Sequence, residues 1–145
     1  MTGARQPVVL VVDDEAPIRQ MVRRILQNSG YRVVEAASGP EALSLLEDGM
    51  PLDLLIADLQ MPELSGEEMA QRVHTTRGDL KVLYVTGNID RLFADRPVLR
   101  EGEAFLDKPF TAEGLRKAVS LLLTGSISGG NRCRRLLSGG VLWAR

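Results

Sequence analysis

The stretch from Leu54 to Gly66 constrains the fold of this chain more than any other. Its first four residues are apolar without alternation, which is typical of a strand buried on both faces of a parallel sheet. Asp58 ends that run, and Met61-Pro62 and Ser65-Gly66 then turn the chain into a loop. In open parallel sheets, ligands bind beyond the carboxyl ends of the strands. Asp58 is therefore a candidate functional residue, although aspartate is also common where a strand simply turns.

Four other apolar runs predict further strands of the same sheet. They occupy residues 8–12, 31–36, 81–85 and 104–106. Apolar residues at helical spacing separate the runs, and Ser38, Ser65 and Thr111 stand where the caps of three helices are expected. The segment 89–101 is the least regular, because Pro97 interrupts any helix there. The pattern predicts an α/β domain in which five helical segments cover both faces of a five-stranded parallel sheet.

Length and charge suggest one folded domain followed by a basic tail. We expect the 145 residues to fold over 7–124, and we expect 125–145, which contain two Gly-Gly pairs, to be disordered. Residues 126–145 hold four arginines and no acidic residue, which leaves 14 basic and 19 acidic residues in 1–125. An acidic domain argues against direct nucleic-acid binding.

Several compositional features indicate the compartment. No apolar run reaches the roughly 18 residues that a membrane span requires. The N-terminal residues do not resemble a secretory signal. A single cysteine, Cys133, excludes an internal disulfide and a cysteine-built metal site. We expect a cytoplasmic protein.

Four of the predicted strands end in polar or charged residues at the same edge of the sheet. These residues are Asp13-Asp14, Asp58, Thr86 and Lys108. Three converging carboxylates would repel one another, and a divalent cation relieves this repulsion. Oxygen ligands suit Mg²⁺, and a lysine and a hydroxyl can bind phosphoryl oxygens. The set predicts phosphoryl transfer, with a carboxylate as a possible nucleophile.

Each of these residues also has an ordinary explanation. Asp13 could cap the first helix, Thr86 could belong to a turn, and Lys108 could be a solvated surface residue. Their joint occurrence at one edge, in this order, favours the functional interpretation.

The chain resembles the receiver domains of two-component response regulators. The resemblance covers about residues 7–124 and rests on four motifs: Asp13-Asp14, Asp58-x-x-Met61-Pro62 reaching Gly66, Thr86-Gly87, and Lys108-Pro109-Phe110. It implies a flavodoxin-like fold with strand order 2-1-3-4-5. It also implies that Asp58 accepts a phosphoryl group from a histidine kinase or a histidine phosphotransfer protein.

The resemblance assigns further roles at the site. Asp14, Asp58 and the backbone carbonyl of Gln60 would bind Mg²⁺ directly, and Asp13 would act through water. Lys108 would contact the phosphoryl group, and its bond to Pro109 is commonly cis in relatives. Such a domain is not an enzyme, beyond catalysing its own phosphorylation and dephosphorylation.

Thr86 and Phe105 match the family's switch pair. Phosphorylation would draw the threonine hydroxyl inward, and the aromatic ring would follow. The switch would act on the face formed by the fourth helical segment, the fifth strand and the last helix. Many relatives carry tyrosine where this chain has Phe105, which can equally be an ordinary core residue. Receivers attached to hybrid sensor kinases have similar sequences in two places, the irregular 88–100 segment and the run from Gly102 to Leu106.

Other classes fit less well. A haloacid-dehalogenase-type phosphatase would need a second aspartate two residues after the first-strand nucleophile, where Glu15 stands, and a cap domain. A pseudo-receiver would have lost one of the site residues. A dinucleotide-binding domain would show G-x-G-x-x-G after the first strand. The roughly 20 residues after the last helix are too few for a DNA-binding module, so we expect function through protein contacts. A phosphate-sink or relay role beside a hybrid kinase is the alternative.

Overall fold

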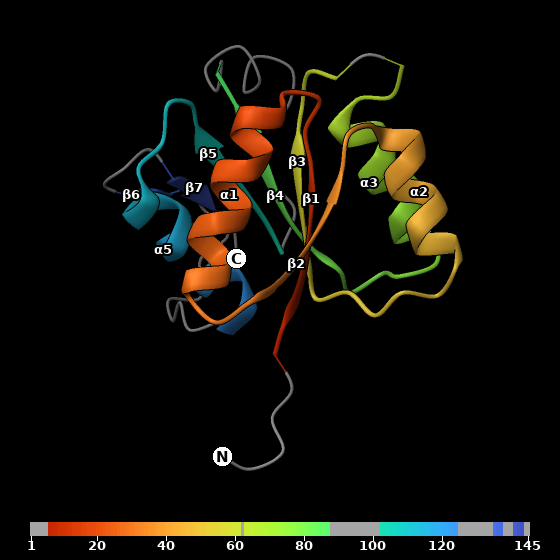
Figure 1. Ribbon diagram of the computed structural model, residues 1–145, viewed down its shortest axis with the longest axis horizontal. Coiled ribbons are helices and arrows are strands. Elements are labelled where there is room, and N and C mark those ends of the chain that lie inside the picture. The colour runs from red at the N-terminus through yellow and green to blue at the C-terminus, as the bar shows by residue number, and fades with distance from the viewer. Residues whose placement is uncertain (1–5, 62, 88–101, 125–134, 138–140, 144–145) are drawn as a thin grey trace.

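A parallel sheet forms the centre of the molecule, and its strands run as the sequence predicts (Figure 1). The structure, a computed structural model, describes residues 6–61, 63–87, 102–124, 135–137 and 141–143. The five parallel strands are β1 (Val8–Val12), β2 (Arg32–Ala36), β3 (Leu54–Asp58), β4 (Lys81–Thr86) and β5 (Glu103–Asp107). Their order is β2-β1-β3-β4-β5, which confirms the flavodoxin-like topology.

Helices cover both faces of the sheet, as right-handed crossovers require (Figure 1). On one side lie α1 (Ala16–Asn28) and α5 (Ala112–Thr124), and on the other lie α2 (Gly39–Glu47) and α3 (Gly66–His74). The fourth predicted helical segment, within 89–101, lies outside the described residues.

Successive strand residues serve two separate cores. In β1, Val9 and Val11 pack with α1 and α5, whereas Leu10 and Val12 pack on the side of α2 and α3. The same alternation continues along β3, whose five residues are all buried. A strand apolar on both faces therefore reads as a continuous hydrophobic run, which is why the pattern in the sequence was informative.

The predicted helix caps are present, with one difference. Ser65 and Glu68 form a full capping box at α3, and Thr111 Oγ1 accepts a hydrogen bond from Gly114 N at 2.9 Å. At α2, Ser38 Oγ accepts from Glu41 N at 3.2 Å. The returning Glu41 carboxylate accepts from Ala37 N instead of Ser38 N, so this box is displaced by one residue.

Part of the tail forms strands, which differs from the expectation that residues 125–145 are disordered. Strands β6 (Arg135–Leu137) and β7 (Val141–Trp143) pair antiparallel, and β7 pairs antiparallel with β5. The two apolar runs flank Ser-Gly-Gly, a spacing typical of a hairpin. Edge strand β5 supplies the unpaired backbone groups to which such a hairpin can add. The sheet therefore has seven strands among the described residues.

Candidate functional site

The carboxyl ends of β1, β3, β4 and β5 meet at one edge and bring the predicted residues together. Asp58 is the last residue of β3, and Asp13 follows Val12, which pairs with Ala57. Thr86 ends β4 and accepts a hydrogen bond at its carbonyl from Lys108 N at 2.8 Å. The Lys108–Pro109 peptide bond is cis, as the resemblance implies.

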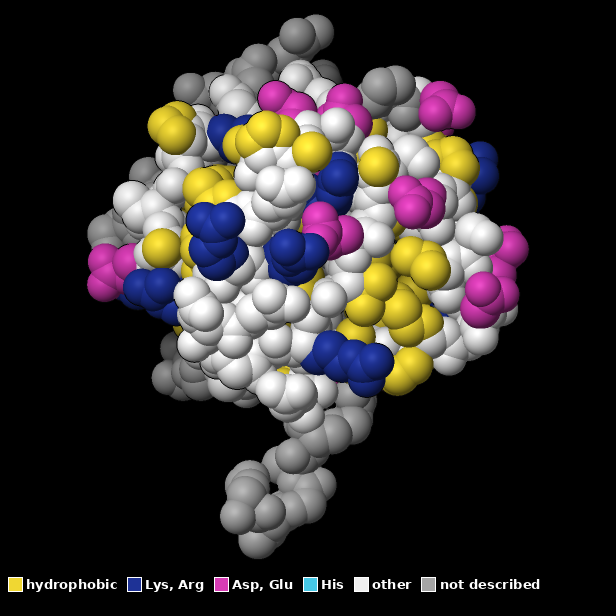
Figure 2. Space-filling model, viewed as in Figure 1, with side chains coloured by type: hydrophobic (Ala, Val, Ile, Leu, Met, Phe, Trp, Pro, Cys, Tyr) yellow, Lys and Arg dark blue, Asp and Glu magenta, His cyan; other side chains and the backbone are white. Residues whose placement is uncertain are grey.

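Three carboxylates form an acidic cluster at this edge. Asp13, Asp14 and Asp58 each offer an oxygen, and these oxygens lie within 4.8 Å of one another. Asp13 and Asp58 are buried, whereas Asp14 is exposed. A set of carboxylate oxygens with one open side fits Mg²⁺, which keeps several waters when it binds to proteins. In Figure 2 acidic side chains gather at the upper edge, where the strands end, and basic side chains lie below them over α1.

Gln60 lies against the phosphoacceptor candidate. Its backbone N–H donates to Asp58 Oδ1 at 3.0 Å, which leaves Asp58 Oδ2 to face Lys108. The role of the Gln60 carbonyl as a metal ligand stays a prediction.

Lys108 is the cation of the site. Its Nζ lies 3.2 Å from Asp58 Oδ2, 3.7 Å from Asp13 Oδ2 and 3.6 Å from Glu15 Oε1. Its side chain is 19% exposed, so it is not the solvated surface lysine of the ordinary explanation. The ammonium is placed to balance the acidic cluster and to meet an anion bound there.

Burial and charge perturb two groups of the site. Burial raises the pKa of Asp13, and the Glu15 N–H and the Lys108 charge offset only part of that rise. Burial lowers the pKa of Lys108, but the negative charges of Asp13 and Asp58 outweigh it, so that the pKa lies above its usual value. Lys108 is therefore charged at neutral pH.

A glycine allows the loop after β3 to close against the site. A Cβ at Gly66 would lie 2.6 Å from the Asp58 carbonyl oxygen, closer than any side chain tolerates. The Gly66 N–H donates to the Leu59 carbonyl at 3.4 Å. The absence of a side chain at Gly66 thus allows the start of α3 to lie against the backbone at the end of β3.

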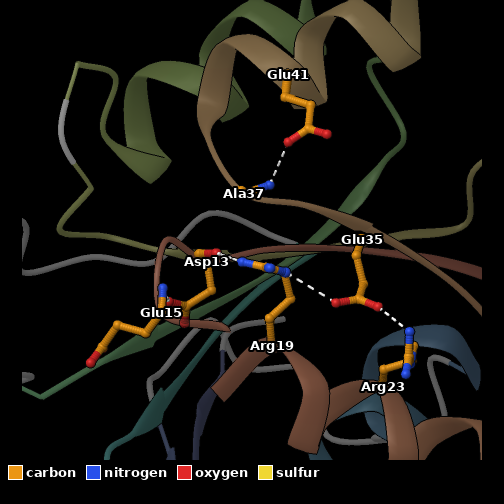
Figure 3. A network of polar contacts seen from close by, with 7 residues as sticks. All are labelled: Asp13, Glu15, Arg19, Arg23, Glu35, Ala37 and Glu41. Carbon is orange, nitrogen blue, oxygen red and sulfur yellow. Dashed lines mark hydrogen bonds and ion pairs between the residues drawn. The ribbon is translucent and has the colours of Figure 1, made fainter. Parts of the chain in front are cut away.

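A polar network that was not predicted from the sequence lies behind Asp13 (Figure 3). Arg19 of α1 donates to the Asp13 carbonyl at 2.7 Å and to Glu35 Oε1 of β2 at 3.0 Å. Glu35 also accepts from Arg23. The sequence does contain a sign of this network: two arginines lie four residues apart on a helix, and the next strand carries a single acidic residue among apolar ones.

The two switch candidates are buried, but their environment contains an unforeseen pair. Thr86 is 2% and Phe105 0% exposed. The Phe105 ring stacks on Tyr84, with centroids 5.0 Å apart and an interplanar angle of 22°. Tyr84 Oη donates to the buried carboxylate of Glu103 at 3.1 Å.

Comparison with known proteins identifies the family. A model of the response regulator receiver domain matches residues 9–120. The chain belongs to this family. The receiver is 31% identical to the chemotaxis response regulator CheY4 of Vibrio cholerae, with a TM-score of 0.71 over 82% of this chain and 100% of that one. It is 32% identical to the receiver domain of the hybrid histidine kinase CckA, with a TM-score of 0.68 over 80% and 98% of the two chains.

Longer relatives contain a similar segment. The sensor kinase CckA of Brucella abortus is 37% identical over 79% of this chain, which spans 12% of that protein. The response regulator MprA of Mycobacterium is 36% identical over 79% of this chain, which spans 50% of it. The receiver therefore spans half or less of these curated relatives. Among the helices that the structure describes, none is long and apolar enough to cross a membrane.

Proposed function

We propose that this receiver accepts a phosphoryl group on Asp58 from a phosphohistidine of a histidine kinase or histidine phosphotransfer protein, with Mg²⁺ bound. The observation that carries the proposal is the 3.2 Å approach of Lys108 Nζ to Asp58 Oδ2, inside a cluster that already holds Asp13 and Asp14. One carboxylate thus lies between a cation and two further acids, where a phosphoryl group could be bound and neutralised.

The proposed reaction assigns a role to each group. An Asp58 oxygen attacks phosphorus, the phosphorus–nitrogen bond breaks, and its electron pair leaves with the histidine. Mg²⁺, held by Asp14, Asp58 and the Gln60 carbonyl with Asp13 through water, would neutralise phosphoryl oxygens. The Gln60 N–H holds Asp58 Oδ1, and Lys108 pairs with the transferred group.

We further propose that Thr86 and Phe105 transmit the conformational response to phosphorylation. A hydrogen bond from the Thr86 hydroxyl to the phosphoryl group exists only in the phosphorylated state, so it can shift a two-state equilibrium. The Phe105 ring would follow and alter the face of β5 and α5 that contacts a downstream protein. Thr86→Ala should therefore leave phosphorylation intact and remove the response of β5 amide NMR shifts to beryllofluoride. Wild-type shift changes in that variant would remove Thr86 from the switch.

The phosphoacceptor can be tested directly. A small-molecule phosphodonor with Mg²⁺ should label the wild-type chain, and peptide mass spectrometry should place the phosphate on Asp58. Asp58→Asn should abolish the label. Asp53→Asn is the matched control, because Asp53 precedes the same strand at its opposite end and accepts from Val8 N at 2.8 Å. Label retained in Asp58→Asn would refute the assignment.

The similarity to CckA favours a second candidate, a relay or phosphate-sink receiver that acts with a hybrid kinase. Both candidates would operate in the cytoplasm. Phosphotransfer profiling against histidine kinases and phosphotransfer proteins of the same genome distinguishes them. Rapid reversible transfer to a phosphotransfer protein supports the relay, whereas one-way transfer from a kinase followed by a contact change supports the switch.

A further inference from the structure

We propose that Arg19, held in place by Glu35, is a positioning residue that orients the Asp13–Asp14 peptide for Mg²⁺ binding. This inference rests on the proposed function, because it concerns the cation at the same acidic cluster. Figure 3 shows the Arg19 side chain between the loop after β1 and the Glu35 side chain of β2. Its side chain is only 16% exposed, so the contacts are largely shielded from solvent.

The Arg19 bond reaches the peptide unit that joins two of the three clustered acids. The acceptor is the Asp13 carbonyl, at 2.7 Å, and that carbonyl belongs to the peptide leading to Asp14. The other polar groups of Asp13 are fixed separately, with its N–H donating to the Ala36 carbonyl and its Oδ1 accepting from Glu15 N. These contacts leave the Asp13–Asp14 peptide free to rotate, and the Arg19 hydrogen bond to the Asp13 carbonyl restrains that rotation. Rotation of this peptide would move Asp14, the exposed acid of the cluster.

The side chain of the N-cap residue of α1 does not hold this carbonyl. Helix α1 begins after Glu15, whose side chain makes no cap hydrogen bond. Its first backbone bond runs from Arg19 N to the Glu15 carbonyl, two residues beyond Asp13. Arg19 thus ties the loop to the helix through its side chain while its own backbone starts the helical bonding.

Glu35 makes this arrangement compatible with binding a cation. An unpaired guanidinium beside the cluster would repel Mg²⁺, but the Glu35 carboxylate lies 3.0 Å from Arg19 Nε and balances its charge. Arg23 binds the other Glu35 oxygen from the more exposed side of α1, with 46% of its side chain exposed. Arg23 shares the ion pair between α1 and β2, whereas the bond to Asp13 is made by Arg19. Arg23 is consequently the matched control.

The test measures Mg²⁺ binding to the full chain by calorimetric titration without any phosphodonor. Arg19→Met should weaken binding by about tenfold, the scale seen when groups that orient metal ligands are removed. Arg19→Lys should fall between wild type and Arg19→Met, because an ammonium lacks the planar fork that reaches two acceptors at once. Arg23→Met should bind Mg²⁺ within about twofold of wild type, as expected of an exposed ion pair.

A second measurement separates positioning from general destabilisation. In phosphorylation assays, Arg19→Met should need about tenfold more Mg²⁺ for half-maximal rate, and the rate at saturating Mg²⁺ should match wild type. Equal Mg²⁺ affinity in wild type and folded Arg19→Met would overturn the inference. If Arg19→Met fails to fold by circular dichroism, Arg19→Lys decides, and wild-type affinity in that variant overturns it. Equal weakening by Arg23→Met would also overturn it. A wild-type chain that binds no Mg²⁺ would instead contradict the proposed function.

Discussion

Replacing Lys108 by methionine should destabilise the metal-free protein and make it strongly dependent on Mg²⁺. Methionine keeps much of the lysine stem but removes the charge that balances Asp13 and Asp58. These carboxylates are 4% and 7% exposed, so water cannot replace the ammonium well. Glu15 is 61% exposed and its contact contributes little.

The size of the effect follows from the contact geometry. At the 3.2 Å separation of Lys108 and Asp58, two unit charges attract by about 5 kcal/mol for an effective dielectric constant near 20. Desolvation offsets much of this attraction, but removing one partner of a buried pair costs about 3–5 kcal/mol, because the other charge is left uncompensated. Lys108 retains some solvent exposure, so the lower end, about 3 kcal/mol, is expected.

Urea unfolding of wild type and variant, each with EDTA and with Mg²⁺, measures the effect. The free energy of unfolding of Lys108→Met should fall by about 3 kcal/mol in EDTA, and Mg²⁺ should recover more stability in the variant than in wild type. Lys117→Met, an exposed site on α5, is the control. In a double-mutant cycle with Asp58→Asn, the two losses should couple by about 1–3 kcal/mol. Strict additivity, or a loss no larger than that of Lys117→Met, would refute the reasoning.

Three shorter predictions concern the acids and the glycine of the site. Asp14→Ala should abolish Mg²⁺ binding in a titration and leave the far-UV circular dichroism unchanged; unaltered affinity would mean that the metal binds elsewhere. Because the pKa of Asp13 is raised in the folded state, its contribution to stability is present below its unfolded value of 3.8 and is lost as pH rises through the folded pKa. Asp13→Asn should thus stabilise the metal-free protein at pH 7 in thermal unfolding, with a gain that disappears on acidification below pH 3.8. Gly66→Ala should cost about 1–3 kcal/mol through overpacking and slow phosphorylation, whereas Gly78→Ala, whose Cβ would meet only the His74 carbonyl at 3.8 Å, should do neither.

The sheet and the site edge could be predicted because they depend on patterns local in sequence. Each parallel strand is buried on both faces, so each appears as an apolar run, and its carboxyl end is marked by the first polar residue. The topology then brings Asp13, Asp58, Thr86 and Lys108 together without any knowledge of side-chain contacts. The cluster of Asp13, Asp14 and Asp58 is the direct consequence.

Contacts between elements could not be predicted in the same way. Arg19 and Arg23 lie off the apolar face of α1, where helical periodicity says only that they avoid the core. Their joint contact with Glu35 depends on how α1 is positioned along β2. The apolar pattern of the helix and that of the strand do not specify this position. Strands β6 and β7 could not be predicted from the sequence, because three residues each are too few for a periodic signal.

One of the two switch candidates, Phe105, is held by contacts within the chain. Phe105 is buried against Tyr84, and an aromatic pair of this kind stabilises by about 0.5–1.5 kcal/mol beyond its buried area. The Tyr84 hydroxyl is in turn held by buried Glu103, two residues before Phe105 on β5. A movement of the Phe105 ring away from Tyr84 would break this stacking contact. A hydrogen bond from Thr86 to a charged phosphoryl group would contribute about 1.5–3 kcal/mol. The stacking contribution alone is smaller than that of the proposed hydrogen bond, so the stack by itself would not prevent the proposed movement of Phe105.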